Sequence, residues 1–163
     1  MFCTPENLPS MPEYGMIFKL NADYENLEWF GMGPEETYSD RADGAKLGIY
    51  SNKVSDNMAA YLIPQECGNK TGVRYAKLTD TNGSGIIFTG DSIEFSALPY
   101  TPHEIECATH HNELPPRHYT IIRVNKMQMG VGGDNSWGAL THPEFLLPEN
   151  TPMHLAFSFK GVI

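Results

Sequence analysis

Glycine and proline are distributed along the whole chain rather than gathered in one linker. The 163 residues include 15 glycines and 12 prolines, which divide the sequence into short runs separated by turn residues. In residues 155–160 the larger apolar side chains occupy every second position, as expected for a strand with one buried face. Short alternating runs with this punctuation are typical of all-β proteins. We therefore predict an all-β fold.

The short runs also give the expected positions of the strands. Residues 79–85, with the sequence TDTNGSG, lie between two of the runs and are predicted to form a hairpin loop. The predicted strands cover residues 16–20, 26–30, 46–52, 59–63, 73–79, 85–89, 93–97, 118–124, 127–131, 144–147 and 154–160.

One short helix is predicted near residues 102–111. Thr101 is suited to cap the helix, Pro102 is favoured at the first helical position, and Glu104 can complete a capping box. We expect the helix to end near Asn112. Residues 1–12 are rich in proline and show no periodicity, so we expect an extended lead-in there and one domain over residues 13–163.

The charge balance disfavours two classes of partner. Lysine and arginine number 11 against 20 aspartates and glutamates, which gives a formal net charge of −9. Nucleic-acid binding needs clustered basic residues, and so does docking on an anionic membrane. No window approaches the roughly 20 consecutive apolar residues of a membrane span. We expect neither a nucleic acid nor a membrane as partner.

The cysteines and the first residues indicate the compartment. Cys3, Cys67 and Cys107 cannot all pair, and none has the spacing of a zinc motif. The N-terminus lacks a basic segment followed by an apolar run, which is the pattern of a signal peptide. We therefore expect a reducing, cytoplasmic location.

Two clusters contain residues capable of chemistry. Glu35, Glu36 and Asp40 lie close together, and two carboxylates about 5–5.5 Å apart would suit a retaining glycosidase. We favour a structural interpretation, because Arg41 is a ready partner for them. Carboxylates in such loops also commonly bind backbone amides.

His110, His111 and Glu113 form the second cluster, with side chains that can bind a metal. Adjacent histidines on a helix end point about 100° apart, and a helix C-terminus favours a cationic imidazole in any case. We therefore favour a structural or simply exposed role. No metal ligand is assigned to this chain.

A tryptophan lies within a glycine-rich polar segment from Gly130 to Gly138. An indole face can stack on the apolar face of a sugar ring, and the neighbouring Asp134 and Asn135 can bind hydroxyl groups. Trp137 could equally be folded back onto the edge of the sheet. The sequence leaves both interpretations open.

Three longer patterns follow one another along the chain. GxGPxExYxDR consists of Gly31, Gly33, Pro34, Glu36, Tyr38, Asp40 and Arg41. YxxPQExGN consists of Tyr61, Pro64, Gln65, Glu66, Gly68 and Asn69, with Arg74 after it. QMGVGGDxSWG runs from Gln128 to Gly138. In this order and spacing, the chain resembles the C-terminal domain, or small chain, of β-galactosidases of glycoside hydrolase family 2.

The resemblance implies an antiparallel β-supersandwich of the galactose-mutarotase-like type, of which this chain is the C-terminal part. It implies that the catalytic glutamates lie in another domain, so no catalytic residue is expected here. Magnesium and sodium would also be bound in other domains, and no cofactor is expected in this chain. Trp137 would form a platform for the leaving-group sugar.

The expected function is that of a non-catalytic portion of a β-galactosidase acting on terminal β-D-galactosides such as lactose. Its expected partners are a galactoside or sugar, the remaining domains or large subunit of the enzyme, and further copies in a homo-oligomer. The alternatives are a mutarotase-like epimerase using His110 with Glu113 or Glu66, and a free carbohydrate-binding module.

Scaffold roles are expected for the remaining residues of the first two patterns. We expect Arg41 and Arg74 to pair with the carboxylates of Glu36, Asp40 and Glu66. The full set of expected scaffold residues is Glu36, Tyr38, Asp40, Arg41, Gln65, Glu66, Asn69 and Arg74.

Overall fold

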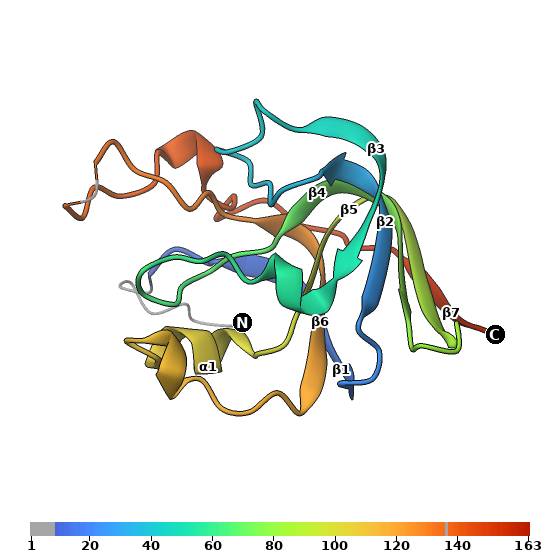
Figure 1. Cartoon of the computed structure of the whole chain (residues 1–163). Coiled ribbons are helices and arrows are strands. Elements are labelled where there is room, and N and C mark those ends of the chain that lie inside the picture. The colour runs from blue at the N-terminus through green and yellow to red at the C-terminus, as the bar shows by residue number, and fades with distance from the viewer. Residues whose placement is uncertain (1–8, 136) are drawn as a thin grey trace, which may run out of the picture.

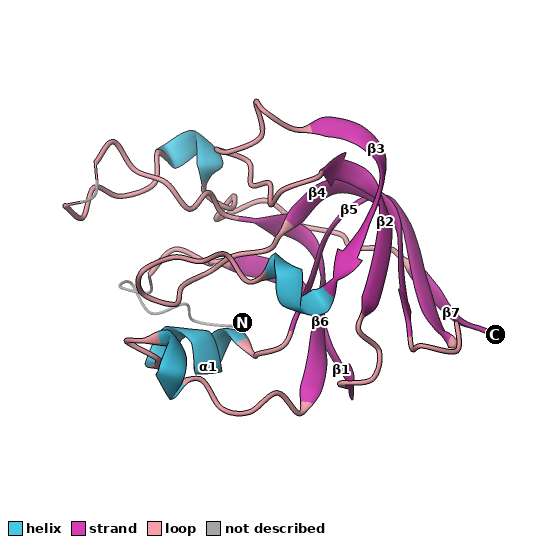
Figure 2. Ribbon diagram, in the orientation of Figure 1, coloured by secondary structure: helices cyan, strands magenta, loops and turns pink. Residues whose placement is uncertain are grey.

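The computed structural model describes residues 9–135 and 137–163. In this part of the chain it is an antiparallel all-β structure with one short α-helix (Figures 1 and 2). Cys3 and residues 1–8 of the expected lead-in lie outside the described residues. The strands are β1 (Glu13–Asn21), β2 (Asn26–Gly33), β3 (Lys46–Lys53), β4 (Lys70–Thr79), β5 (Gly85–Leu98), β6 (Tyr119–Gln128) and β7 (Ser158–Val162).

All of these strands belong to one seven-stranded sheet built around β5. The strand order is β1-β6-β5-β4-β2-β3, and β7 also pairs with β5. Residues 85–89 of β5 pair with β7, whereas residues 94–98 pair with β6. Between these halves Ser92 has a φ of 135°, a value that few residues other than glycine adopt. β5 bends along its length (Figure 1), and the sheet curls over its own apolar face.

The curled sheet encloses a core as a β-sandwich does. Phe18 of β1 and Phe88 of β5 are not on neighbouring strands, yet their ring centroids lie 5.2 Å apart. In β2 every second residue is buried, including Leu27 and Trp29, which is the alternation expected of a strand with one face in the core. The all-β, antiparallel sandwich expected from the sequence is confirmed.

The helix starts as predicted and ends earlier. In α1 (Pro102–Cys107), Thr101 Oγ1 accepts a hydrogen bond from the Glu104 amide at 3.2 Å, and Glu104 accepts one from the Thr101 amide at 2.7 Å. Ala108 is extended, so the helix stops there rather than near Asn112. Three 3₁₀ turns complete the described elements: η1 (Val54–Asn57), η2 (His111–Glu113) and η3 (Pro143–Phe145). No helix among the described residues is long and apolar enough to cross a membrane.

Several predicted strands are wrong in extent or type. Residues 59–63 form a loop without a strand partner. Of residues 144–147, the first two belong to the 3₁₀ turn at Pro143–Phe145 and none is in a strand. The strand predicted over residues 127–131 stops after its second residue, because β6 ends at Gln128. Residues 85–89 and 93–97 belong to one strand, and of residues 154–160 only the last three are in β7. Strand formation needs a hydrogen-bonding neighbour as well as an apolar pattern, and the pattern alone does not reveal the neighbour.

Candidate functional site

The segment after β6 forms a loop that closes on itself. The Gly130 amide donates to the Phe145 carbonyl at 2.9 Å, and Thr141 Oγ1 donates to the Gly130 carbonyl at 3.0 Å. Farther out, a Cβ on Gly133 would collide with the carbonyl oxygen of Ala139. Only glycine therefore allows the two sides of the loop to approach so closely. We call residues 129–142 the Trp137 loop, referring to its described residues.

The Trp137 loop projects away from the strands (Figure 1). Trp137 itself is 91% exposed. Its amide donates to Asn135 Oδ1 at 2.8 Å, and the following Gly138 has a φ of +99°, which favours glycine. The alternative in which the indole packs back onto the edge of the sheet is therefore wrong. The loop presents a large aromatic face outward.

Asp134 and Asn135, the predicted sugar-binding residues beside Trp137, each use one side-chain oxygen within the loop. Asn135 caps the Trp137 amide, and Asp134 Oδ1 lies 2.8 Å from His142 Nε2. The hydrogen bond and the charge of Asp134, with a smaller contribution from Glu144, raise the pKa of His142 above its usual value. These contacts hold the shape of the loop. The role of both residues in binding a sugar stays a prediction.

The first sequence pattern forms a tight turn fastened to the second. Tyr38 and Arg41 exchange two backbone hydrogen bonds of 3.1 and 2.9 Å. The carboxylate of Glu36 binds Arg41 Nη1 at 2.7 Å and accepts a hydrogen bond from the Gly68 amide at 2.7 Å. Tyr61 contacts both Glu36 and Arg41 through its hydroxyl. The pairing of Glu36 with Arg41 predicted from the sequence is present.

Arg123 on β6 is a buried charged residue with several partners. Its guanidinium binds Glu66 through two hydrogen bonds of 2.8 and 2.5 Å. It also binds Glu13 at 3.2 Å and Ser96 Oγ at 2.9 Å. The residue is only 2% exposed, and a charge at this depth needs such partners because desolvation penalises it.

Arg123 was not among the residues predicted from the sequence, and it is the true partner of Glu66. We expected Arg41 or Arg74 to pair with Glu66. Arg74 is instead exposed, with its guanidinium 5.9 Å from the centre of the Phe30 ring. Arg123 is the only charged residue in the apolar run TIIRV. A single charge within such a run could have indicated a buried ion pair.

A half-buried acid, Glu94, lies beside this network. Glu94 Oε2 accepts hydrogen bonds from Asn69 Nδ2 at 2.8 Å and from the Gln128 amide at 3.1 Å. Burial raises the pKa of Glu94 to about 7, against the lowering effect of these bonds and of Arg123. Asn69 also donates to the Thr37 carbonyl at 3.1 Å. It therefore ties the first two sequence patterns to the acid.

A cavity of about 530 Å³ separates the Arg123 network from the base of the Trp137 loop. Glu66 and Arg123 line one part of it, and Met129 and Thr141 of the loop line another. Gln65, an expected scaffold residue, is exposed and lines the same cavity. The ion pair and the loop are thus neighbours in space.

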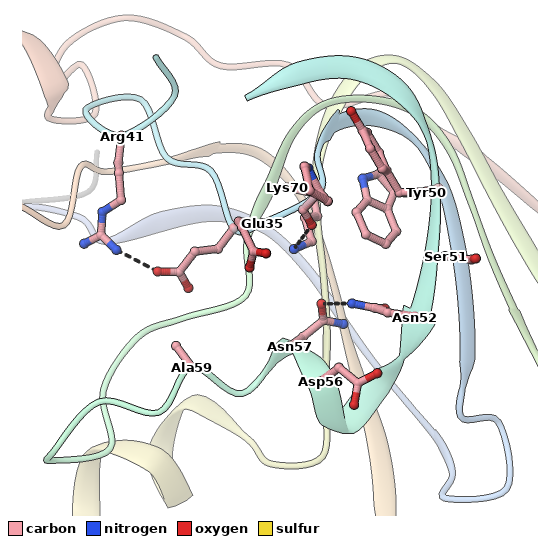
Figure 3. A pocket seen from close by; sticks show the side chains of 12 residues that line it. Glu35, Arg41, Tyr50, Ser51, Asn52, Asp56, Asn57, Ala59 and Lys70 are labelled. Atoms are coloured by element: carbon pink, nitrogen blue, oxygen red, sulfur yellow. Dashed lines mark hydrogen bonds and ion pairs between the residues drawn. The ribbon is translucent and has the colours of Figure 1, made fainter. Parts of the chain in front are cut away.

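A second cavity of about 530 Å³ lies between the first sequence pattern and β3 (Figure 3). Lys70 is buried in its wall, where Nζ donates to the Pro34 carbonyl at 3.4 Å and lies 4.9 Å from the centre of the Trp29 ring. Burial lowers the pKa of this amine to about 8. Glu35 also lines the cavity, so this acid is separate from Glu66 and Glu94.

The histidines of the second candidate cluster have different partners. His110 Nδ1 lies 3.4 Å from Glu113 Oε1, whereas His111 Nε2 lies 2.6 Å from the Tyr61 carbonyl oxygen. Both histidines are exposed. Over residues 9–135 and 137–163, no three His, Cys, Asp or Glu side chains are grouped to hold a metal ion. The geometry supports the structural interpretation of this cluster.

The fold, with its hydrogen bonds and ion pairs between loops and strands, defines a β-sandwich domain whose buried polar residues hold its loops in place. The family model described as the β-galactosidase small chain matches residues 2–159. The chain therefore belongs to the β-galactosidase small-chain family.

The individual proteins that the chain resembles are also β-galactosidases. The chain is 48% identical to a β-galactosidase of Halalkalibacterium halodurans over 159 residues, which are 96% of this chain and 16% of that protein. It is 46% identical to a β-galactosidase of Priestia megaterium over 156 residues, 95% of this chain and 15% of that protein. A Vibrio cholerae β-galactosidase is 32% identical over 91% of this chain. The chain spans about 15% of the length of the relatives it matches.

Proposed function

We propose that this chain is the non-catalytic C-terminal portion of a glycoside hydrolase family 2 β-galactosidase, an enzyme that hydrolyses terminal β-D-galactosides such as lactose. The chain would complete the subsite for the leaving-group sugar through Trp137. The observation that carries this proposal is the 91% exposed indole on a braced loop, in a chain that belongs to a β-galactosidase family. We propose a cytoplasmic location, with magnesium and sodium bound in other domains.

The carboxylates of Glu36 and Asp40 have structural partners, which supports a non-catalytic role for this cluster. Glu36 binds Arg41 and the Gly68 amide, and Asp40 binds the Gly132 amide. An acid–base pair would need to face a shared substrate site, whereas these carboxylates hold turns and loops together.

The geometry does not favour the epimerase alternative. Glu66 is bound by Arg123 and accepts a hydrogen bond from the Tyr38 hydroxyl at 3.0 Å. His110 pairs locally with Glu113 in an exposed turn. Neither carboxylate is held ready to exchange a proton with a sugar.

Exposed apolar side chains on the two end strands of the sheet, β1 and β3, support packing against the rest of such an enzyme. Large apolar side chains on β1 and β3 are more than half exposed: Met16, Ile17, Leu47 and Ile49. Exposed apolar side chains along a sheet edge form a surface that favours contact with another protein surface. We propose that the remaining domains cover part of this surface, and that copies of the enzyme assemble into a homo-oligomer.

Replacing Trp137 with alanine in the intact enzyme is expected to raise the KM for lactose by roughly tenfold. One stacked aromatic face contributes about 1–2 kcal/mol, and about 1.4 kcal/mol corresponds to a factor of ten. The KM for an aryl galactoside should change less, because its leaving group is not a sugar. Steady-state kinetics and a melting curve measure both effects.

Leu140→Ala is the matched control, because Leu140 is 88% exposed on the same loop. It should leave both KM values and the melting temperature unchanged. Trp137→Phe should retain part of the lactose affinity. A large loss of melting temperature in Trp137→Ala, with unaltered lactose kinetics, would contradict the proposed subsite.

A further inference from the structure

We propose that Asp40 is a positioning residue for the Trp137 loop. The contact joins two parts of the chain 92 residues apart: Asp40 Oδ2 accepts a hydrogen bond from the Gly132 amide at 2.6 Å. Asp40 would thereby set where Trp137 stands in the leaving-group subsite. This inference rests on the proposed function for its consequence in catalysis, and on the geometry alone for the effect on the loop.

The backbone of the loop is shaped to receive this carboxylate. A Cβ on Gly130 would lie 2.6 Å from Asp40 Oδ2 and 2.9 Å from the Cβ of Phe145. A Cβ on Gly132 would lie 3.2 Å from the same carboxylate oxygen. The glycines at these positions therefore let the main chain come close enough for the amide of Gly132 to reach Asp40.

Asp40 is itself held in place by the core. It lies within the turn that the two backbone hydrogen bonds between Tyr38 and Arg41 close. Tyr38 is fully buried, and its hydroxyl donates to Glu66, which is bound in turn by Arg123. A connected set of contacts thus runs from the buried ion pair to the base of the loop.

The other oxygen of the carboxylate indicates that Asp40 is not placed for stability alone. Asp40 Oδ1 is buried and has no hydrogen-bond partner among the described residues. A buried acceptor without a partner costs free energy. A carboxylate here is therefore best explained by what its second oxygen does, which is to accept from the loop.

Hydrogen exchange in the 163-residue chain tests the positioning directly. In Asp40→Ala the Gly132 amide should exchange at least tenfold faster, while the amides of β4 should keep their rates. Asp40→Asn should restore most of the protection, because its carbonyl oxygen can still accept the bond. Asp43→Ala is the matched control, since Asp43 is exposed in the same connection and should change nothing.

Kinetics of the intact enzyme test the consequence. Asp40→Ala should raise the KM for lactose about three- to tenfold, up to the effect expected for loss of the indole face. It should leave kcat for an aryl galactoside unchanged. The double variant of Asp40→Ala with Trp137→Ala should have the same KM for lactose as Trp137→Ala alone, because both changes remove the same contribution of the indole face to binding. Asp40→Asn should recover most of the lactose affinity.

A second route removes the contact without touching the carboxylate. Gly130→Ala places a methyl group against Asp40 Oδ2 and should reproduce the faster exchange of Gly132. Unchanged Gly132 exchange in both Asp40→Ala and Gly130→Ala would overturn the positioning role. If Trp137→Ala leaves lactose kinetics unaltered while Gly132 exchange responds as expected, the proposed subsite fails and the positioning of the loop stands.

Discussion

Replacing Arg123 with methionine is expected to lower the free energy of unfolding by about 3–5 kcal/mol. The guanidinium is 2% exposed and binds Glu66, Glu13 and Ser96. Without it, the carboxylate of Glu66 loses its counter-charge in a partly buried place, and this stranding is the main cost. In a domain of this size the melting temperature should fall by roughly 6–20 °C.

Arg74→Met is the matched control for this experiment. Arg74 is exposed and lies over the ring of Phe30, so its loss should change stability by no more than about 0.5 kcal/mol. Replacing Glu66 with leucine together with Arg123→Met should cost less than the sum of the single variants, because the carboxylate of Glu66 is then no longer left without its counter-charge. A melting curve of Arg123→Met that matches the unaltered chain would contradict the role of this ion pair.

Glu94→Gln is expected to stabilise the chain above pH 7 by up to about 3 kcal/mol. Burial raises the pKa of Glu94 to about 7 in the folded state, so the folded chain binds more protons than the unfolded chain between about pH 4.5 and 7. The contribution of Glu94 to stability therefore falls as the pH rises through this range. Denaturant unfolding of both proteins from pH 5 to pH 8 measures the difference.

The gain from Glu94→Gln should shrink towards pH 5, where the folded chain keeps Glu94 protonated. Glutamine retains an oxygen that can accept from Asn69 and from the Gln128 amide, as Glu94 does. Glu106→Gln on α1 removes the same charge from an exposed position and serves as the control. If the difference in free energy of unfolding between Glu94→Gln and the unaltered chain does not depend on pH, the pKa of Glu94 is not raised in the folded state and this prediction is wrong.

Features set by neighbours in the sequence were predictable. The cap of α1 needs only Thr101, Pro102 and Glu104, and the alternation of β2 appears in its own residues. The hairpin between β4 and β5 follows from the turn residues 79–85. Each of these features depends on contacts within a few positions, which a pattern in the sequence can record.

The candidate site was predictable only in its parts. The sequence identified the Trp137 segment and the patterns around Asp40 and Glu66, and it predicted the pair of Glu36 with Arg41, which are five residues apart. It assigned Glu66 to a nearby arginine, whereas the true partner, Arg123, is 57 residues away. It gave no reason to join Asp40 to Gly132.

The sequence by itself determined the all-β class, the start of the helix and the family, since all three depend on local patterns or on residues in a fixed order. Only the tertiary structure decided that β5 is one bent strand, that Trp137 projects outward, and that Arg123 and Asp40 hold distant segments. These features depend on the curl of the sheet, which brings the loop after β6 beside the turn at Asp40. A hydrogen bond or ion pair between such segments is set by distance in space, and no local pattern records that distance.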